Sequence, residues 1–287
     1  MILITDGGST KCDWIAIDSS GERLAQKIRT KGLNPAILTE TELKQIISGS
    51  EELMQFSSDV SHIFFYGAGC GTEKPRTMLT HVLQFLFPSA NVDVQEDTMA
   101  AVRASLNHND EAAVVCIMGT GSNCSYFDGS ILHQRVKSLG YTLMDDASGN
   151  YFGKRLIRDY YFKKMPETIE LAFEHKYNLD PDYIKFNLYK KANPNAYLAD
   201  FAEFMFLNKD SDYIKELIKS GIRVFTENMI LQFREELDTS IPVHFAGSIA
   251  YFSQDEIKEV AEEYNFKVGN FVRRPIDGLV DYHIKNL

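Results

Sequence analysis

The sequence predicts an α/β protein in which one domain plan occurs twice, and three observations carry this prediction. Three short apolar runs separated by turns open the chain, and the same pattern returns near its middle. Strand-like and helix-like segments alternate after the first set of runs. A long stretch at about 151–240 is helical. We therefore expect two domains, 1–110 and 111–274, that enclose a cleft, with the helical stretch inserted in the second. The last helix, at about 275–287, is expected to pack back on the first domain.

The repeated pattern is a three-stranded meander that opens on a loop of small residues. Strands are expected at 2–4, 12–17 and 24–28 in the first copy, and at 113–118, 124–127 and 131–132 in the second. Gly, Ser and Asp residues separate these apolar runs, which is the usual signal of strands joined by tight turns. Two such meanders in one chain indicate a duplicated domain.

Helices and strands alternate in the remainder of the chain. Helices are expected at 40–53, 76–87, 98–106 and 254–264, and further strands at 62–66, 92–94 and 243–246. This alternation predicts mostly parallel sheets with helices on their faces. Within the helical stretch, Asp180-Pro181 and Asn193-Pro194 are typical of helix starts.

The composition is that of an ordinary globular protein, with 44% hydrophobic and 24% charged residues. The formal net charge of −10 repels phosphate polymers, so we expect no nucleic-acid partner. No apolar run approaches the roughly 20 residues that span a bilayer, and the apolar segment Met1–Thr5 is too short for a signal peptide. We therefore expect no membrane association. The four widely spaced cysteines include no CxxC pair and favour a reduced, cytoplasmic protein.

The first loop, with the sequence DGGSTK, has the residue types that bind an anion. The backbone at Gly8 can approach a phosphate closely, the hydroxyls of Ser9 and Thr10 add donors, and Lys11 adds positive charge. Asp6, at the end of the preceding strand, suits a metal-bound water. A plain hairpin turn with a solvated lysine is the alternative. The chain contains neither GxxxxGK[ST] nor GxGxxG, which excludes a Walker-type loop.

The second loop, GTGSN at 119–123, occupies the equivalent place in the second copy. Two such loops suit the clamping of a nucleotide's phosphates from both sides. Asp97 lies between them in sequence, where a predicted strand ends and a helix begins. Side chains at strand ends line the ligand crevice of α/β sheets, and a carboxylate there can take a proton from an attacking hydroxyl. A helix cap is the alternative role for Asp97.

These segments resemble those of the sugar kinase/Hsp70/actin superfamily. DGGSTK near the N-terminus, EDT at 96–98 and GTGSN before a strand carry the general resemblance. The segment GYTLMDDASG at 140–149 is similar to the GDEGSG segment of the N-acetylglucosamine kinase group, which also includes the activators of 2-hydroxyacyl-CoA dehydratases. GLNP at 32–35 resembles an Asn-containing loop of that group. AGSI at 246–249 and PIDG at 275–278 resemble the superfamily's adenosine loop and its closing segment.

The resemblance implies a duplicated, ribonuclease-H-like and actin-like ATPase fold. It also implies a kinase that uses ATP and magnesium to phosphorylate an amino sugar, in the first place the 6-hydroxyl of N-acetylglucosamine. Asp97 would be the catalytic base, and Asp6 would position the magnesium ion. The ATP contacts it implies are Gly8, Ser9, Thr10, Lys11, Thr120 and Gly247, and the sugar contacts are Asn34, Asp97, Ser122, Asn123 and Asp145. The resemblance leaves open whether the chain forms a homodimer.

The chain departs from the group's pattern at Leu139, Met144, Asp146, Ala147 and Ser248. Most of these positions lie in the segment assigned to the sugar, so they leave the identity of the sugar open. A kinase for glucosamine or for a sugar of the muramic acid type is the nearest alternative. An ATPase activator or sensor that drives a partner is the alternative from another class. In that class Cys70 would be the candidate iron–sulfur ligand.

Overall fold

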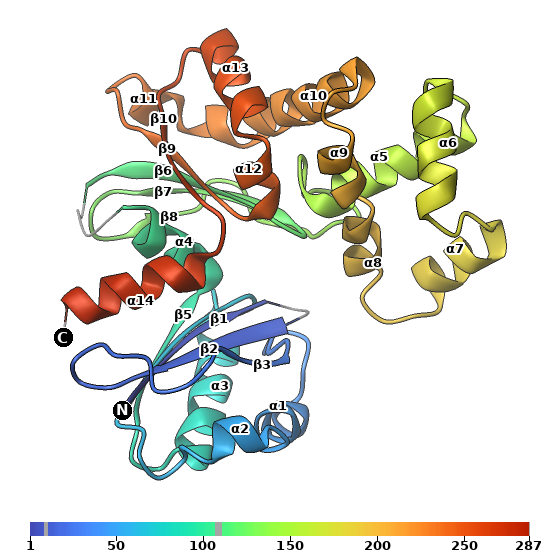
Figure 1. Ribbon diagram of the computed structural model, residues 1–287. Coiled ribbons are helices and arrows are strands. Elements are labelled where there is room, and N and C mark those ends of the chain that lie inside the picture. The colour runs from blue at the N-terminus through green and yellow to red at the C-terminus, as the bar shows by residue number, and fades with distance from the viewer. Residues whose placement is uncertain (9–10, 107–110, 287) are drawn as a thin grey trace. The chain divides into compact units, whose positions relative to one another are not determined.

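The computed structural model describes residues 1–8, 11–106 and 111–286. The chain divides into two compact units, the first made of Met1–Asn109 with Arg274–Leu287 and the second of Asp110–Arg273. Each unit is built on a five-stranded sheet with helices packed against it (Figure 1). The α/β class and the duplicated plan predicted from the sequence are confirmed.

The first unit carries the sheet order β3-β2-β1-β4-β5. Its elements are β1 (Ile2–Gly7), β2 (Lys11–Ile17), β3 (Ile28–Lys31), α1 (Glu40–Ser48), α2 (Glu51–Met54), β4 (His62–Gly67), α3 (Glu73–Leu86), β5 (Asn91–Glu96), α4 (Asp97–Ser105) and α14 (Pro275–Lys285). The strands β1, β4 and β5 run parallel, whereas β2 is antiparallel to both β1 and β3. The sheet is therefore mixed rather than mostly parallel, because the meander contributes two antiparallel pairs.

The two faces of this sheet bury alternate residues of each strand. On β1, Leu3 packs in the cluster that includes Leu79 of α3. Ile4, on the opposite face, packs with Ala100 of α4 and Leu279 of α14. Successive side chains of a strand point to opposite faces, so one apolar run supplies both layers. The C-terminal helix α14 thus completes the core of the first unit.

The second unit carries the order β10-β9-β6-β7-β8. Its elements are β6 (Ala113–Met118), β7 (Ser122–Phe127), β8 (Leu132–His133), α5 (Gly149–Tyr161), α6 (Glu167–Lys176), α7 (Pro181–Tyr189), α8 (Pro194–Asp200), α9 (Glu203–Leu207), α10 (Asp212–Asn228), η1 (Ile230–Phe233), α11 (Arg234–Leu237), β9 (Val243–Ala246), α12 (Ser248–Phe252), α13 (Gln254–Tyr264) and β10 (Val268–Val272). Counted along the chain, the strands of both units follow the spatial order third, second, first, fourth, fifth. In both, the first pairs antiparallel with the second and parallel with the fourth.

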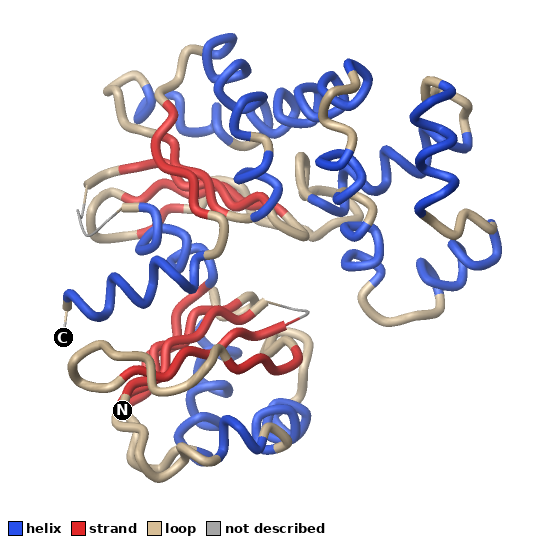
Figure 2. The backbone as a smooth tube through the Cα atoms, viewed as in Figure 1, coloured by secondary structure: helices blue, strands red, loops and turns tan. Residues whose placement is uncertain are grey.

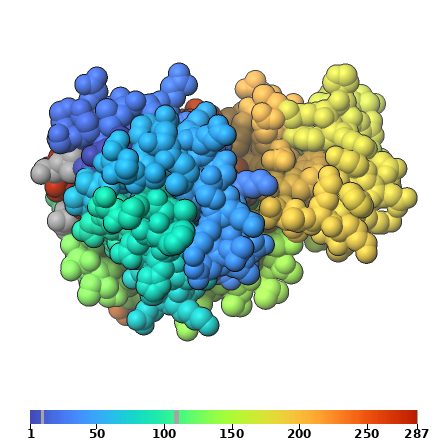
Figure 3. Space-filling model, turned by 90° about the horizontal axis from the view of Figure 1, so that it is seen from below, coloured from blue at the N-terminus to red at the C-terminus, as the bar shows by residue number. Residues whose placement is uncertain are grey.

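The predicted helical stretch 151–240 contains most of α5 and every helix up to α11, with no strand. The tube view separates these helices from the red strands of the sheet (Figure 2). In the space-filling view the surface of α6 and α7, in yellow, forms one continuous lobe (Figure 3). The start of α7 is as predicted, because the side chain of Asp180 accepts hydrogen bonds from the backbone of Asp182 and Tyr183. None of the described helices is both long and apolar enough to cross a bilayer.

Two element predictions were wrong. The third strand, expected at 24–28, is β3 at Ile28–Lys31, and Leu24 is exposed. The connection from β2 to β3 is longer than the expected turn, since β2 ends at Ile17 and β3 begins at Ile28, and Arg23 within it forms an isolated bridge with Ile17. The helix expected at 40–53 is interrupted after Ser48 and resumes at Glu51.

Candidate active site

Three parallel strands of the first unit end side by side. Gly7 of β1 is paired with Gly67 of β4, which is paired in turn with Glu96 of β5. Asp6 precedes the end of β1, and Asp97 follows β5 as the first residue of α4. The carboxyl ends of parallel strands are where α/β sheets hold their ligands. The fold therefore brings the two acids singled out in the sequence to one edge of one sheet.

Asp6 is only weakly acidic in this setting. Burial raises the pKa of its carboxyl to about 7, and repulsion from Asp97 and Asp13 adds to the increase. Lys11 and Lys27 act in the opposite direction. The repulsion between Asp6 and Asp97 is the electrostatic sign that the two carboxyls face the same space.

Asp97 is tuned to exchange a proton near neutral pH. Burial, with repulsion from Glu96, raises the pKa of its carboxyl to about 6. Hydrogen bonds from the backbone N–H groups of Thr98 and of Asp97 itself act in the opposite direction. The carboxylate thus interacts with the start of α4, as the capping alternative requires. A group that is mostly ionised at pH 7 and still basic is also what general-base catalysis needs.

Asn34 approaches the same edge from the loop after β3. Its side-chain oxygen accepts a hydrogen bond from the backbone N–H of Ala36, at 2.9 Å. Gly69, in the loop that follows β4, has a φ of +81°, and a Cβ built on it would lie 2.0 Å from Asn34 Oδ1. Only glycine permits this close passage of the loop. A Cβ on Gly71 would lie 3.0 Å from Glu96 Oε2, so this one loop touches both Asn34 and the end of β5.

The first glycine loop is partly described. The backbone N–H of Gly8 donates to the carbonyl of Lys11 at 2.8 Å, which closes a hairpin between β1 and β2. The side chain of Lys11 is exposed at the start of β2. The predicted ATP contacts Ser9 and Thr10 lie outside the described residues.

The second glycine loop joins β6 to β7 and is held by the first turn of α5. The N–H of Gly149 donates to the carbonyl of Gly119 at 2.7 Å, and the N–H of Asn150 to that of Thr120 at 3.1 Å. Gly247, between β9 and α12, lies against the strand that leads into this loop. A Cβ on Gly247 would lie 2.4 Å from the carbonyl oxygen of Met118. The structure therefore places Gly247 against Met118 and Gly119, at the start of the loop that carries Thr120.

The segment assigned to the sugar folds against the same loop. A Cβ on Gly121 would lie 2.7 Å from Asp145 Oδ2. The hydroxyl of Ser122 donates to the carbonyl of Asp146 at 2.7 Å. The pKa of Asp145 lies above its ordinary value, because the effect of burial outweighs that of the hydrogen bond from the side chain of Asn150. Asp145, Ser122 and the glycine loop thus form one cluster in the second unit.

Asn123 lies on β7 and uses its amide oxygen locally. Asn123 Oδ1 accepts a hydrogen bond from the backbone N–H of Cys124, at 2.8 Å. Its amide nitrogen is a donor, which suits the hydroxyl oxygen of a sugar.

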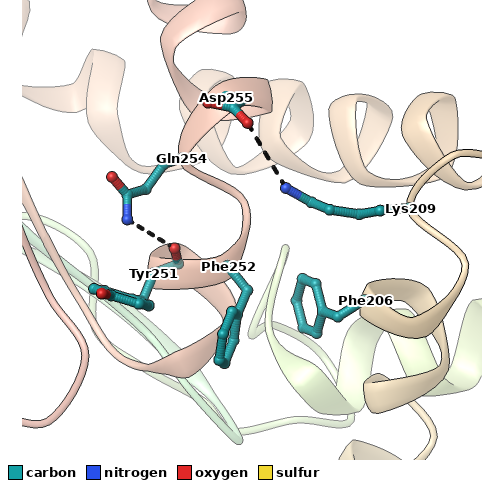
Figure 4. A pocket seen from close by; sticks show the side chains of 6 residues that line it. All are labelled: Phe206, Lys209, Tyr251, Phe252, Gln254 and Asp255. Carbon is teal, nitrogen blue, oxygen red and sulfur yellow. Dashed lines mark hydrogen bonds and ion pairs between the residues drawn. The ribbon is translucent and has the colours of Figure 1, made fainter.

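Aromatic residues line a pocket that begins at Ser248, the residue after Gly247. A cavity of about 550 Å³ lies between α9 and α12, and Asp200, Glu203, Ser248 and Ile249 are among its lining residues. Phe206 and Phe252 form the wall between this cavity and a neighbouring one of about 320 Å³, since both residues line both. Figure 4 shows the two rings beside each other; their centroids lie 5.2 Å apart and their planes are tilted by 43°. The guanidinium of Arg273 lies 4.9 Å from the centre of the Phe252 ring.

A smaller cavity of about 200 Å³ adjoins Asp145. Its polar lining comes from Ser122, Ser138, Asp145, Asp146 and Asn228, and its apolar lining from Val136, Leu143, Met144 and Met229. Asn228 Nδ2 donates to Asp146 Oδ2 at 2.9 Å, so the end of α10 is tied to the sugar-assigned segment. Met144 and Asp146, two departures from the sequence pattern, line this cavity.

Comparison with solved structures finds a close relative over the whole chain. A candidate N-acetylglucosamine kinase from Porphyromonas gingivalis is 33% identical, with a TM-score of 0.91, and the match covers 100% of this chain and 99% of that one. A candidate N-acetylglucosamine kinase from Chromobacterium violaceum has a TM-score of 0.71 at 13% identity, with 98% of each chain covered.

A third structure shares the fold at lower similarity. A glucokinase of the ROK family from Streptomyces griseus, solved with glucose and AMPPNP, has a TM-score of 0.66 at 11% identity and covers 98% of this chain and 97% of its own. No protein-family model matches this chain, and no curated protein does.

Proposed function

Because the chain belongs to the N-acetylglucosamine kinase family of actin-like sugar kinases, we propose that it transfers the γ-phosphate of ATP to a hydroxyl of an amino sugar, in the first place the 6-hydroxyl of N-acetylglucosamine. The family resemblance seen in the sequence motifs is confirmed, and the protein is an ATP-dependent sugar kinase. The observation that carries the proposal is Asp97, a carboxylate with a pKa of about 6 at the end of a parallel strand.

In the proposed reaction Asp97 accepts the proton of the sugar hydroxyl as the oxygen attacks the γ-phosphorus. Phosphoryl transfer depends mainly on positioning and on charge neutralisation, with one base to orient the nucleophile. A pKa near the working pH keeps Asp97 ionised in most molecules while preserving its basicity. The backbone N–H groups at the start of α4 favour the ionised form of this carboxylate.

The residues present fit a magnesium ion. Asp6 and Asp97 are hard oxygen ligands, and their ionised forms repel each other. A divalent cation would relieve this repulsion. We assign Asp6 to hold it, directly or through a water, and the ion when bound supplies positive charge to the phosphates of ATP.

We assign the nucleotide to the two glycine loops, through Gly8, Ser9, Thr10, Lys11, Thr120 and Gly247. The 550 Å³ cavity beside Gly247 suits the adenine base, because an aromatic wall favours a flat ring. The carboxylate of Asp200 in its lining is an acceptor for an amino group, whereas Glu203 Oε2 already accepts from Lys176 Nζ at 2.8 Å.

We assign the sugar to Asn34, Asp97, Ser122, Asn123 and Asp145. The 200 Å³ cavity next to Asp145 combines acids with the apolar side chains of Met144 and Met229. This mixture suits an acylamino group, which presents both an amide and a methyl group. It therefore favours an N-acylated sugar over a plain hexose. The four free, buried cysteines agree with a reduced compartment, and we place the protein in the cytoplasm.

The test of this proposal is an assay of ADP release across a panel of sugars. We expect the highest kcat/KM for N-acetylglucosamine, with N-acetylmuramic acid, glucosamine and glucose as comparisons. A preference for glucose would contradict the amino-sugar assignment. A preference for N-acetylmuramic acid would make that sugar the substrate and would leave the amino-sugar class unchanged.

The pH dependence of the reaction follows from Asp97. Its carboxyl must be ionised to act as a base, and its pKa is about 6. Measured with saturating magnesium and ATP, which keep Asp6 ionised, kcat/KM for the sugar is expected to be constant above about pH 7 and to fall tenfold per pH unit below about pH 6. A steady-state pH–rate profile between pH 5 and 9 measures this. A flat profile down to pH 5 would show that no group with this pKa is required.

Thr120→Val tests the second glycine loop. The substitution keeps the volume and removes one hydroxyl donor, while the carbonyl of residue 120 keeps its bond from the N–H of Asn150. Losing one hydrogen bond to a charged phosphate costs about 1.5 kcal/mol or more, so we expect the KM for ATP to rise about tenfold. Thr239→Val is the matched control, because its hydroxyl donates to Glu236 in α11. Equal KM values in the two variants would remove Thr120 from the nucleotide site.

A further inference from the structure

Asn150, the second residue of α5, is a fully buried amide that the sequence motifs did not single out. Its side chain joins two segments with different proposed roles. Asn150 Nδ2 donates to the carbonyl oxygen of Thr120 at 2.7 Å and to Asp145 Oδ2 at 3.1 Å. Both partners are acceptors, so the amide nitrogen, and not the oxygen, must face them.

The backbone of Asn150 contributes a separate contact. Its N–H also donates to the carbonyl of Thr120, at 3.1 Å, and this bond is independent of the side chain. Any substitution except proline keeps it, together with the bond between Gly149 and Gly119. The attachment of the loop to α5 therefore does not need the amide group. What the side chain adds is the link to Asp145.

The buried amide is costly, which indicates a specific role. Asn150 Oδ1 has no hydrogen-bond partner within the part of the chain that the structure describes. An amide that leaves water and satisfies only one of its two polar ends loses free energy relative to an apolar residue of the same size. Asp145 also has a φ of +67°, a conformation that a residue other than glycine holds only when its surroundings impose it. The hydrogen bond from Asn150 is one such constraint.

We propose that Asn150 is a positioning residue that locks the carboxylate of Asp145 to the Gly119–Gly121 loop, so that the acid which binds the sugar and the loop which binds the phosphates keep one fixed geometry. The inference rests on the proposed function, because the roles of Asp145 and Thr120 come from it. Without the amide, Asp145 is free to turn away, and its unpaired oxygen repels the carbonyl of Thr120. Sugar binding and turnover then both suffer.

The test compares Asn150→Ala with Asn150→Asp. Alanine removes the donor at every pH, so we expect kcat/KM for N-acetylglucosamine to fall about 10- to 100-fold, the loss typical of one hydrogen bond to a charged group, with both KM and kcat affected. Aspartate has nearly the shape of asparagine but donates only when it is protonated. Burial and the neighbouring Asp145 both raise the pKa of such a carboxyl.

The sign of the expected pH effect follows from the groups around residue 150. Asp145 and Asp146 disfavour a further negative charge. Lys154 favours one, although its ammonium also donates to the carbonyl of Tyr141 at 2.7 Å. We expect the activity of Asn150→Asp relative to the wild type to rise at least tenfold as the pH falls from 8 to 5.5. For Asn150→Ala this ratio stays constant. A merely structural role would give a ratio for Asn150→Asp that follows its Tm and not the protonation of one group.

Asn187→Ala is the matched control, because Asn187 is also buried and donates its amide to a helix carbonyl, that of Tyr183, at 2.7 Å. We expect its kcat/KM to equal that of the wild type. If the wild type is active and Asn150→Ala has unchanged kinetics, the inference is overturned and the proposed function stands. The same holds if the activity ratio of Asn150→Asp to the wild type does not change with pH. A wild type that phosphorylates no sugar of the panel would overturn the proposed function, and the inference with it.

Discussion

Asp97→Asn is expected to lower kcat by about 10²–10⁴-fold, the usual contribution of a positioned general base. The asparagine side chain keeps the shape of the aspartate and its place at the start of α4, but it cannot accept the proton of the sugar hydroxyl. The affinity for ATP, measured by calorimetry with a non-hydrolysable analogue, should change no more than a few-fold. Asp93→Asn is the control on β5, the strand that precedes Asp97. Gln95 Nε2 donates to Asp93 Oδ1 at 2.8 Å there, and the turnover of this variant should stay within about twofold of the wild type. Near-normal turnover in Asp97→Asn would reduce Asp97 to a helix cap.

The stability of Asp97→Asn provides a second readout. The folded protein holds the pKa of Asp97 at about 6, above the ordinary value of 3.8, so the folded state binds this proton more tightly than the unfolded state does. The charged carboxyl therefore costs stability progressively as the pH rises from about 4 to 6, and the full cost is present above that range. Asparagine removes the charge, so we expect the Tm of the variant at pH 7–8 to be at least as high as that of the wild type. A lower Tm would show that the lost turnover reflects damage to the fold.

Gly247→Ala is expected to raise the KM for ATP about 100-fold and to lower the Tm by several degrees. Gly247 has φ 108° and ψ 162°, a region that is essentially restricted to glycine. The added Cβ would also lie 2.4 Å from the carbonyl oxygen and 2.7 Å from the carbonyl carbon of Met118, and backbone atoms cannot move aside as a side chain can. Strain of about 3 kcal/mol corresponds to roughly a hundredfold change in an equilibrium constant.

The control for this strain is Gly119→Ala, measured for stability only. Within the described part of the chain, and leaving aside its two sequence neighbours, no atom lies within 4 Å of a Cβ built on Gly119, so the Tm of this variant should remain close to that of the wild type. Thermal unfolding of both variants, with and without ATP, separates the strain from the loss of the ligand. If Gly247→Ala unfolds at the wild-type temperature and binds ATP normally, the close contact between Gly247 and Met118 is required neither for stability nor for ATP binding.

Local patterns accounted for most of the fold. The two meanders were recognised because apolar runs and Gly/Ser/Asp turns report strands within a few residues, and the same run of signals occurred twice. The third strand of the first meander was misplaced because Leu24 is apolar but exposed, a case in which hydrophobicity does not report burial. The interruption of the helix at 40–53 falls at Gly49-Ser50, where Gly49 caps α1 and Ser50 precedes α2.

Some residues of the candidate site could likewise be named from the sequence, and others only from the folded structure. Asp6 and Asp97 could be named from the sequence because each ends a predicted strand, and parallel strands place such ends at one edge. Their pKa values could not be anticipated, since burial and the mutual repulsion of acids 91 positions apart exist only in the folded chain. No sequence pattern singled out Phe206 and Phe252, and only the meeting of their rings from α9 and α12 makes them the wall of a pocket.

The sequence by itself determined the α/β class, the duplication, the two glycine loops and the acid at the junction of β5 and α4, because each depends on neighbours within one turn or one strand. The tertiary structure decided which side chains meet. Asn150 reaches a carbonyl 30 residues away and a carboxylate five residues away, and no local pattern distinguishes it from an ordinary asparagine in the first turn of a helix. Contacts of this kind depend on where α5 is anchored, and only the packing of the whole unit fixes that position.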